Sequence, residues 1–534
     1  MRCYDLSDPK SRVVGKVLRD QAAHVGDTVW LHSDARKVTF AEAERLVNQY
    51  ARGLMAAGIE KGESVAMLVD PSIDAMLLAM AVARAGALFT TINTDFHTGF
   101  LEEALAQAQS RLLIVDAAYL PRLDKLPSLA GIGAVFTIGE SAAIAAIAHK
   151  PVADWLALSD EPVEEVAGWL DPVQCWWSSG TTGKPKGVLH SHSSVLIQCT
   201  AYNREYLDGE VLYTCTPFYL GSAWSGSLWT SLVYGVTAAI DARFSVSRFW
   251  DRIRHYNATQ AFTLGAMHIL LWKQPPSPRD TDHALRRFVG IPMPSDLIPK
   301  FKKRFGIGAM SQGYGTSETF RVFDAPDDDS DKTGALIGTP VPRYEVALLD
   351  PEDLPVPQGT GGEICVRPRE PGHLFLGYFG DPQRTLDSWT NLWHHTGDMA
   401  VQQDDGLYYF ADRKKDYIRY KGRSLSMFEI EQVVDKHPDV ADVAAYGIQS
   451  AELESEAELM IAVVRRPDAT LAAEQLARFI NDQAPYFYVP RFIRFIAELP
   501  RNAHGRIQKN DLRDEGVTAD TWDREATDFV VTRG

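Results

Sequence analysis

The sequence predicts an α/β protein with a large N-terminal domain and a small α+β C-terminal domain. Strand–helix–strand patterns fill most of the chain, short strands and turns replace them from about Gly334, and an α+β pattern begins near Arg413. A chain of 534 residues exceeds one ordinary core, so two or more domains are expected. We predict two domains, residues 1–412 and residues 413–534. The first domain should hold parallel sheets with helices and a β-rich subdomain.

The clearest evidence for a parallel sheet lies near the N-terminus. The apolar run 64–69, the helical pattern 73–85 and the extended run 88–93 follow one another closely. Strand, helix and strand at this spacing indicate a βαβ unit with parallel pairing. Further strands of the first domain are expected at 112–115, 134–138, 211–216, 238–240, 261–264, 288–294 and 308–315.

The later part of the chain changes character twice. The β-rich part is expected to contain strands at 346–349, 364–367, 399–402 and 407–411. The small C-terminal domain is expected to contain helices at 428–435, 471–484 and from about 509, with strands at 440–448, 459–465 and 492–497.

Composition narrows the class of protein. The net charge of −16 argues against nucleic acid as a partner, because the phosphate backbone would be repelled. Five scattered cysteines without metal-ligand spacing predict reduced thiols in a cytoplasmic protein. The N-terminus is too polar for a signal peptide. The most apolar early run, 75–91, is interrupted by Arg84 and Gly86 and is too short to span a membrane.

Two features resemble metal sites but are interpreted otherwise. The acidic run 327–331 has no histidine or fixed glycine beside it, so we expect a solvated loop. His394 and His395 are adjacent on an extended segment, where neighbouring side chains point apart, so we expect no metal there.

The stretch 176–187, WWSSGTTGKPKG, carries the strongest chemical signal. A loop rich in glycines and hydroxyls exposes backbone N–H groups to a polyanion, and lysines add positive charge. A P-loop of the NTPases would need glycine where Pro185 stands, so that interpretation fails. The remaining alternative is a glycine-rich surface turn. We predict a phosphate-binding loop.

With these residues the chain resembles the adenylate-forming superfamily, which includes acyl-CoA synthetases, adenylation domains and luciferases. The segment 311–318 (SQGYGTSE) resembles the family's YGxTE element, and 393–398 (WHHTGD) resembles its WxxTGD element. The segments 243–250 and 274–277 resemble the branch of the carnitine and crotonobetaine CoA ligases. The resemblance implies ATP, Mg²⁺, coenzyme A and a small carboxylic acid, a mobile C-terminal lid, and an acyl-AMP intermediate. It also allows a homodimer.

The resemblance implies roles for named residues. The implied nucleotide-binding residues are Ser179, Gly180, Thr181, Thr182, Gly183, Lys186, Gly290, Ile291, Gly313, Tyr314, Gly315, Thr316, Asp398 and Arg413. The implied catalytic residues are Thr182, Glu318 and Arg506, with Glu318 also the metal ligand and Lys415 the hinge. The implied acyl pocket contains Tyr219, Trp224, Gly265 and Gly313, although aromatic residues at such positions are as often simple core.

The tail departs from the family pattern. Arg506 stands at the position of the catalytic lysine, Tyr488 where a lysine often precedes Val-Pro, and Ser424 where some relatives carry an arginine for CoA. The sequence therefore predicts an ATP-dependent carboxylate–CoA ligase that releases AMP and pyrophosphate. It leaves two alternatives open: an adenylating enzyme with another acceptor, such as a carrier protein or an amine, and an impaired nucleotide- or acyl-binding relative.

Overall fold

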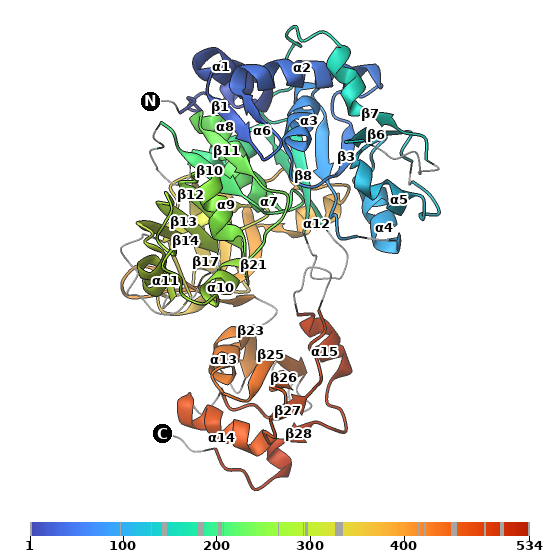
Figure 1. The fold of residues 1–534 in the computed structure, drawn as a ribbon. Helices are drawn as coiled ribbons and strands as arrows, with labels where there is room; N and C mark the ends of the chain where they lie inside the picture. The colour runs from blue at the N-terminus through green and yellow to red at the C-terminus, as the bar shows by residue number, and fades with distance from the viewer. Residues whose placement is uncertain are drawn as a thin grey trace. The chain divides into compact units, whose positions relative to one another are not determined.

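The chain forms two compact units, Met1–Glu345 with Val366–Leu392, and Val346–Cys365 with Trp393–Gly534 (Figure 1). The computed structural model describes all residues except 1–2, 97, 130, 141–146, 179–185, 201–205, 207, 265, 292, 294–296, 326–334, 414–416, 421–422, 450–456, 485–487, 502–506 and 532–534. The mixed α/β class predicted from the sequence is confirmed. No helix of this described part is both long and apolar enough to cross a membrane.

The first unit contains a mostly parallel eight-stranded sheet in the order β19-β9-β8-β4-β3-β5-β6-β7. Its strands are β3 (Ser64–Leu68), β4 (Leu88–Thr91), β5 (Leu112–Asp116), β6 (Ala134–Ile138), β7 (Lys150–Pro151), β8 (Pro172–Ser178), β9 (Lys186–Ser191) and β19 (Gly377–Tyr378). The predicted βαβ unit is confirmed, since β3 and β4 pair in parallel with Ser64 opposite Leu88. Strand β9 turns back antiparallel to β8, so the predicted phosphate loop joins two neighbouring strands.

A second series of strands in the first unit runs in the order β16-β15-β14-β13-β12-β10-β11-β1-β2. Its members are β1 (Val29–His32), β2 (Lys37–Thr39), β10 (Val211–Thr214), β11 (Thr237–Ile240), β12 (Gln260–Leu264), β13 (Arg287–Ile291), β14 (Ala309–Thr316), β15 (Phe320–Ala325) and β16 (Leu336–Pro340). Strands β1 and β10 to β14 pair in parallel, and β14 to β16 are antiparallel.

Helices pack on these sheets, and α2, α3, α6 and α12 begin with a side-chain cap. The helices of the first unit are α1 (Val14–Val25), α2 (Phe40–Ala56), α3 (Ile73–Arg84), α4 (Thr98–Ala108), α5 (Leu120–Leu123), α6 (His192–Ile197), α7 (Gly221–Ala223), α8 (Trp229–Tyr234), α9 (Phe249–His255), α10 (Ala266–Trp272), α11 (Ile298–Phe305) and α12 (Pro382–Asp387). Thr39 Oγ1 accepts a hydrogen bond from Glu42 N at 3.2 Å, and Glu42 Oε2 accepts one from Thr39 N at 2.8 Å. This capping box satisfies two amides at the start of α2.

The second unit contains the predicted small α+β fold. Its elements are β17 (Tyr344–Leu349), β18 (Gly361–Pro368), β21 (Trp393–Gln402), β22 (Tyr408–Arg413), β23 (Tyr417–Tyr420), β24 (Arg423–Ser426), α13 (Met427–Val434), β25 (Val440–Gln449), β26 (Ala457–Arg465), α14 (Ala473–Gln483), β27 (Phe492–Phe495), α15 (Lys509–Glu515) and β28 (Trp522–Asp523). The first two residues of β17, the last three of β18 and the short β20 (Trp389–Thr390) belong to the first unit.

Alternation along β25 and β26 explains the helices on both faces of the sheet β25-β26-β27-β28. Ala445 and Ile461 belong to the core with α13 and α14, whereas Tyr446 and Met460 belong to the core with Leu512 of α15. Successive strand residues point to opposite faces, so two apolar cores form from one pair of strands. Figure 1 shows α15 on the other side of this sheet from α13.

The predicted domain boundary does not coincide with the division into compact units. Residues 412 and 413 lie in β22, which pairs antiparallel with β21, and this hairpin belongs to the second unit. The boundary between domains at 412/413 therefore stays a prediction.

Two carboxylates meet at the carboxyl ends of β3 and β5 because the two strands are parallel neighbours. The Asp70 amide donates to Asp116 Oδ2 at 2.6 Å. Burial, opposed by this hydrogen bond and assisted by the charge of Asp70, raises the pKa of Asp116 to about 7. A carboxyl group whose pKa is raised in the folded state stabilises the fold most at low pH, and this contribution is lost between the ordinary pKa and about 7.

We predict that Asp116→Asn becomes more stable relative to the wild type as the pH rises. The amide oxygen still accepts the Asp70 hydrogen bond, and no charge has to be buried. Urea unfolding at about pH 5 and pH 8 measures the difference. The exposed Asp154 provides a control, since Asp154→Asn should change little at either pH. A difference for Asp116→Asn that does not vary with pH would contradict the prediction.

Candidate functional site

The predicted phosphate loop is framed by β8 and β9. Its residues Ser179, Gly180, Thr181, Thr182 and Gly183 lie outside the described part, and β9 begins at Lys186. A Cβ atom at Gly187 would lie 2.9 Å from Cys175 Sγ and from the Trp177 ring. The glycine therefore allows the close approach of β9 to β8.

Lys186 contacts the carboxylate of Glu318, which lies in the turn between β14 and β15. Its Nζ lies 2.5 Å from Glu318 Oε1 and donates to the Tyr378 hydroxyl at 3.1 Å. The Tyr378 hydroxyl donates to the same Glu318 oxygen at 2.9 Å. Glu318 is 5% exposed, so its charge depends on these partners. Burial, assisted by the neighbouring Glu318, strongly raises the pKa of Tyr378, which keeps its proton.

A buried histidine fixes the turn that carries Glu318. His190 Nε2 lies 2.8 Å from the Ser317 carbonyl, and the ring packs against Trp176 and Phe320 with centroids 4.5 and 4.4 Å away. Burial lowers the pKa of His190 to about 4, so the ring is neutral near pH 7. Since the Ser317 carbonyl can only accept, Nε2 carries the proton. No role of His190 or Tyr378 could be predicted from the sequence, because Ser317 and Lys186, which they contact, lie far away along the chain.

The predicted adenine-binding segments lie on neighbouring strands. Strands β13 and β14 pair in parallel, with Val289 opposite Ser311, which brings Gly290 and Ile291 near Gly313 and Tyr314. Tyr314 is 8% exposed and packs edge-on against Phe323.

Two glycines of β14 are required by the neighbouring strand β15. A Cβ atom at Gly313 would lie 2.3 Å from the Phe323 carbonyl oxygen, and one at Gly315 would lie 1.8 Å from that of Phe320. Thr316 Oγ1 accepts from the Glu318 amide at 3.2 Å and so closes the turn that follows.

The second unit holds the predicted ribose pair. Asp398 and Arg413 stand opposite each other in the antiparallel pair β21–β22. The Asp398 side chain is half-buried, and its amide donates to Thr396 Oγ1 at 3.2 Å.

The predicted acyl-pocket residues divide between core and surface. Trp224 is fully buried among Phe89, Phe218 and Trp229, and its indole N–H donates to the Phe218 carbonyl at 2.7 Å. This placement favours the core alternative for Trp224. The half-buried Tyr219 donates from its hydroxyl to Asp95 Oδ2 at 3.3 Å. Gly265 lies outside the described residues.

The hinge Lys415 and the tail residue Arg506 also lie outside the described residues. Arg501 and Ile507 form an antiparallel bridge. Lys509, the alternative cation of the tail, lies 2.9 Å from Glu431 Oε1.

Comparison with known proteins decides the family. The model of the AMP-binding enzyme family matches residues 18–379, and the model of its C-terminal domain matches residues 429–506. The chain belongs to the AMP-binding enzyme family.

Relatives and solved structures agree with this assignment. A crotonobetaine/carnitine–CoA ligase from Citrobacter koseri is 26% identical over 90% of this chain and 93% of its own length. ATP-bound MatB from Rhodopseudomonas palustris has a TM-score of 0.80 at 23% identity, covering 94% of this chain and 98% of its own. The amide bond synthetase McbA from Marinactinospora thermotolerans has a TM-score of 0.79 at 24% identity, covering 94% and 100%. The resemblance to the adenylate-forming enzymes and to the carnitine and crotonobetaine CoA ligases, predicted from the sequence, is confirmed.

We predict two separable effects of Lys186→Ala. Removing the cation leaves the Glu318 charge buried, which should cost about 1–3 kcal/mol of stability, less than for a fully buried pair because Lys186 is partly exposed. The rate of pyrophosphate exchange into ATP in the presence of the carboxylic acid substrate should fall about ten- to a thousand-fold.

The double variant Lys186→Ala/Glu318→Gln separates the two effects. It should recover stability, because the buried charge that has lost its contact with Lys186 is removed, but it should not recover exchange. Thermal unfolding and the exchange assay measure the two quantities. Exchange at the wild-type rate in Lys186→Ala would contradict the assignment of Lys186.

Proposed function

We propose that this enzyme activates a small carboxylic acid with ATP·Mg²⁺ and passes the acyl group to coenzyme A. The observation that carries the proposal is the group formed by Lys186, Glu318 and Tyr378 directly after the predicted phosphate loop. A lysine and a carboxylate at this place provide a partner for phosphate oxygens and a ligand for the cation that accompanies them.

In the first step, a carboxylate oxygen of the substrate attacks the α-phosphorus of ATP, and the bond to pyrophosphate breaks. This chemistry needs no nucleophilic side chain, since positioning and charge stabilisation supply most of the catalysis. We assign the phosphates to Thr181, Thr182 and Lys186, and the ribose hydroxyls to Asp398 and Arg413. Mg²⁺, held by Glu318 and the phosphates, would neutralise phosphate charge. A single protein carboxylate suits Mg²⁺, which usually keeps substrate phosphates and water as its other ligands.

In the second step, the thiol of coenzyme A loses its proton and attacks the acyl carbonyl, and AMP leaves. A rotation of the C-terminal domain about Lys415 would allow one active site to serve both steps. The named relative is a CoA ligase, which favours coenzyme A as the acceptor. An amine acceptor is the alternative, since an amide bond synthetase shares the fold.

The acid is best sought first among betaines. The relatives are named for crotonobetaine and carnitine, whose cationic end would find an aromatic ring and a carboxylate in the linked pair Tyr219 and Asp95.

All five cysteines are free, which supports a reducing compartment such as the cytoplasm. We further propose a homodimer, which light scattering can test.

A screen of carboxylates by ATP–pyrophosphate exchange tests the proposed function. Exchange that depends on one acid supports adenylation, and its absence with every acid would favour a nucleotide-binding relative without activity. Adding coenzyme A or an amine to the active mixture then identifies the acceptor, since mass spectrometry distinguishes a thioester from an amide.

We predict that Arg506 acts in the first step alone. Arg506→Ala should reduce acyl-AMP formation and leave thioester formation from supplied acyl-AMP nearly unchanged, because the cation serves the carboxylate and the α-phosphate. Arg506→Lys should keep or raise the rate of acyl-AMP formation. Single-turnover measurements of each half-reaction test this. An unchanged first step in Arg506→Ala would remove the tail from the mechanism.

A further inference from the structure

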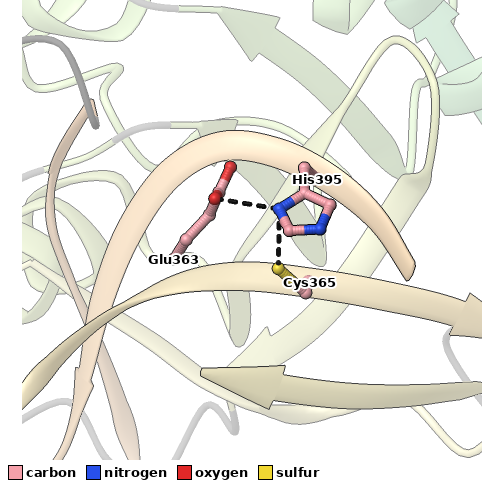
Figure 2. A group of neighbouring side chains, drawn as sticks. All are labelled: Glu363, Cys365 and His395. Carbon is pink, nitrogen blue, oxygen red and sulfur yellow. Dashed lines mark hydrogen bonds and ion pairs between the residues drawn. The ribbon is translucent and has the colours of Figure 1, made fainter. Parts of the chain in front are cut away.

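A buried carboxylate lies beside the segment that carries Asp398. Figure 2 shows Glu363 and Cys365, both on β18, directed toward His395 of β21. Glu363 Oε2 lies 3.0 Å from His395 Nδ1, and Cys365 Sγ lies 3.4 Å from the same nitrogen. Glu363 and Cys365 precede His395 by about thirty positions in the sequence. The spacing of the cysteines and histidines therefore did not reveal the cluster.

The two oxygens of Glu363 serve different groups. While Oε2 contacts His395, Oε1 accepts a hydrogen bond from the Gly397 amide at 3.0 Å. The side chain of Glu363 is 4% exposed, so these contacts replace water around its charge. Gly397 has a φ of +75°, which glycine adopts without strain. Glu363 therefore binds both sides of the turn that precedes Asp398.

A second link holds the same turn. The Thr396 hydroxyl donates to the Ile364 carbonyl at 2.8 Å and accepts from the Asp398 amide at 3.2 Å. Residues 395–398 are thus attached to β18 by one side chain from each strand. The backbone direction at Asp398 depends on both attachments.

The cluster does not require a metal ion to satisfy its charges. Both close contacts share the single nitrogen Nδ1 of His395, and one Glu363 oxygen already accepts an amide hydrogen. Glu363, Cys365 and Nδ1 of His395 are therefore mutual contacts, while Nε2 of the same ring lies 3.6 Å from Asp353 Oδ1.

We propose that Glu363 is a positioning residue for ribose recognition. By holding the turn 395–397 against β18, it sets the direction in which Asp398 meets the two ribose hydroxyls. The inference rests on the proposed role of Asp398. A carboxylate accepts hydroxyl hydrogen bonds well only at suitable angles, so a loosened turn should weaken the ribose contact selectively.

The test compares the binding of AMP and 2′,3′-dideoxy-AMP by titration calorimetry. Glu363→Ala should weaken AMP binding about tenfold and change dideoxy-AMP binding little, because the second nucleotide has no hydroxyls to lose. Glu363→Gln should bind both nucleotides nearly as the wild type does. Its amide oxygen can accept from Gly397, and its NH₂ group can donate to His395 Nδ1 when the ring carries its proton on Nε2. Glu345→Ala is the matched control, since Glu345 is half exposed and pairs with Arg367 at the surface.

A second variant, Thr396→Val, tests the same proposal if Glu363→Ala does not fold. Thr396→Val keeps the shape of the side chain and removes the link to Ile364, so it should show the same selective loss of AMP binding. Asp398→Ala serves as the reference. Equal losses for both nucleotides in Asp398→Ala would refute its ribose role and with it part of the proposed function. Selective loss in Asp398→Ala but not in Glu363→Ala or Thr396→Val would overturn the positioning role alone.

Discussion

The pair formed by the partly exposed Lys186 and the buried Glu318 is the interaction on which the rest of the first unit's site depends. The Glu318 charge would be costly alone, and Lys186 at 2.5 Å offsets that cost. With the proposed roles of the two residues, the pair would also couple two binding events. A phosphate oxygen that contacts Lys186 would weaken its contact with Glu318, and a divalent cation beside Glu318 would compensate the charge of that carboxylate. The Tyr378 hydroxyl contacts both partners. We therefore propose that ATP and Mg²⁺ bind more favourably together than either one alone.

The pair exists because backbones approach one another closely. Gly187 lets β9 lie against β8, and Gly315 lets β14 lie against β15, since a Cβ atom at either position would collide with its neighbour. His190 then joins β9 to the carbonyl beside Glu318. Its low pKa, caused by burial, means that this link is a neutral hydrogen bond and stays unchanged over the range in which an ordinary histidine titrates. Small residues and one neutral ring thus set the distance between the two charged groups.

The sequence predicted the strands and helices of this fold well, because apolar runs and helical periodicity are local signals. The βαβ unit at β3–α3–β4 and the strands β25 and β26 follow from apolar runs of strand length. It could not predict contacts between distant segments. Tyr378 reaches Lys186 from far along the chain, and Trp224, an expected pocket residue, is core because Phe89 and Phe218 surround it. Nor could it show that the hairpin β21–β22 groups with the C-terminal residues, since that depends on packing.

The tail shows how pairing within the second unit narrows the choice of a catalytic cation. Lys509 is bound to Glu431, and the same Glu431 oxygen accepts the Ala445 amide, so Lys509 contributes to the join between α15, α13 and β25. Moving it to a substrate would break this contact. Arg506 lies outside the described residues. Its guanidinium stays charged at any working pH and offers two parallel donors to an oxyanion. If the first step needs charge more than the shape of an ammonium group, we expect Arg506 to supply that charge while Lys509 keeps its contact with Glu431.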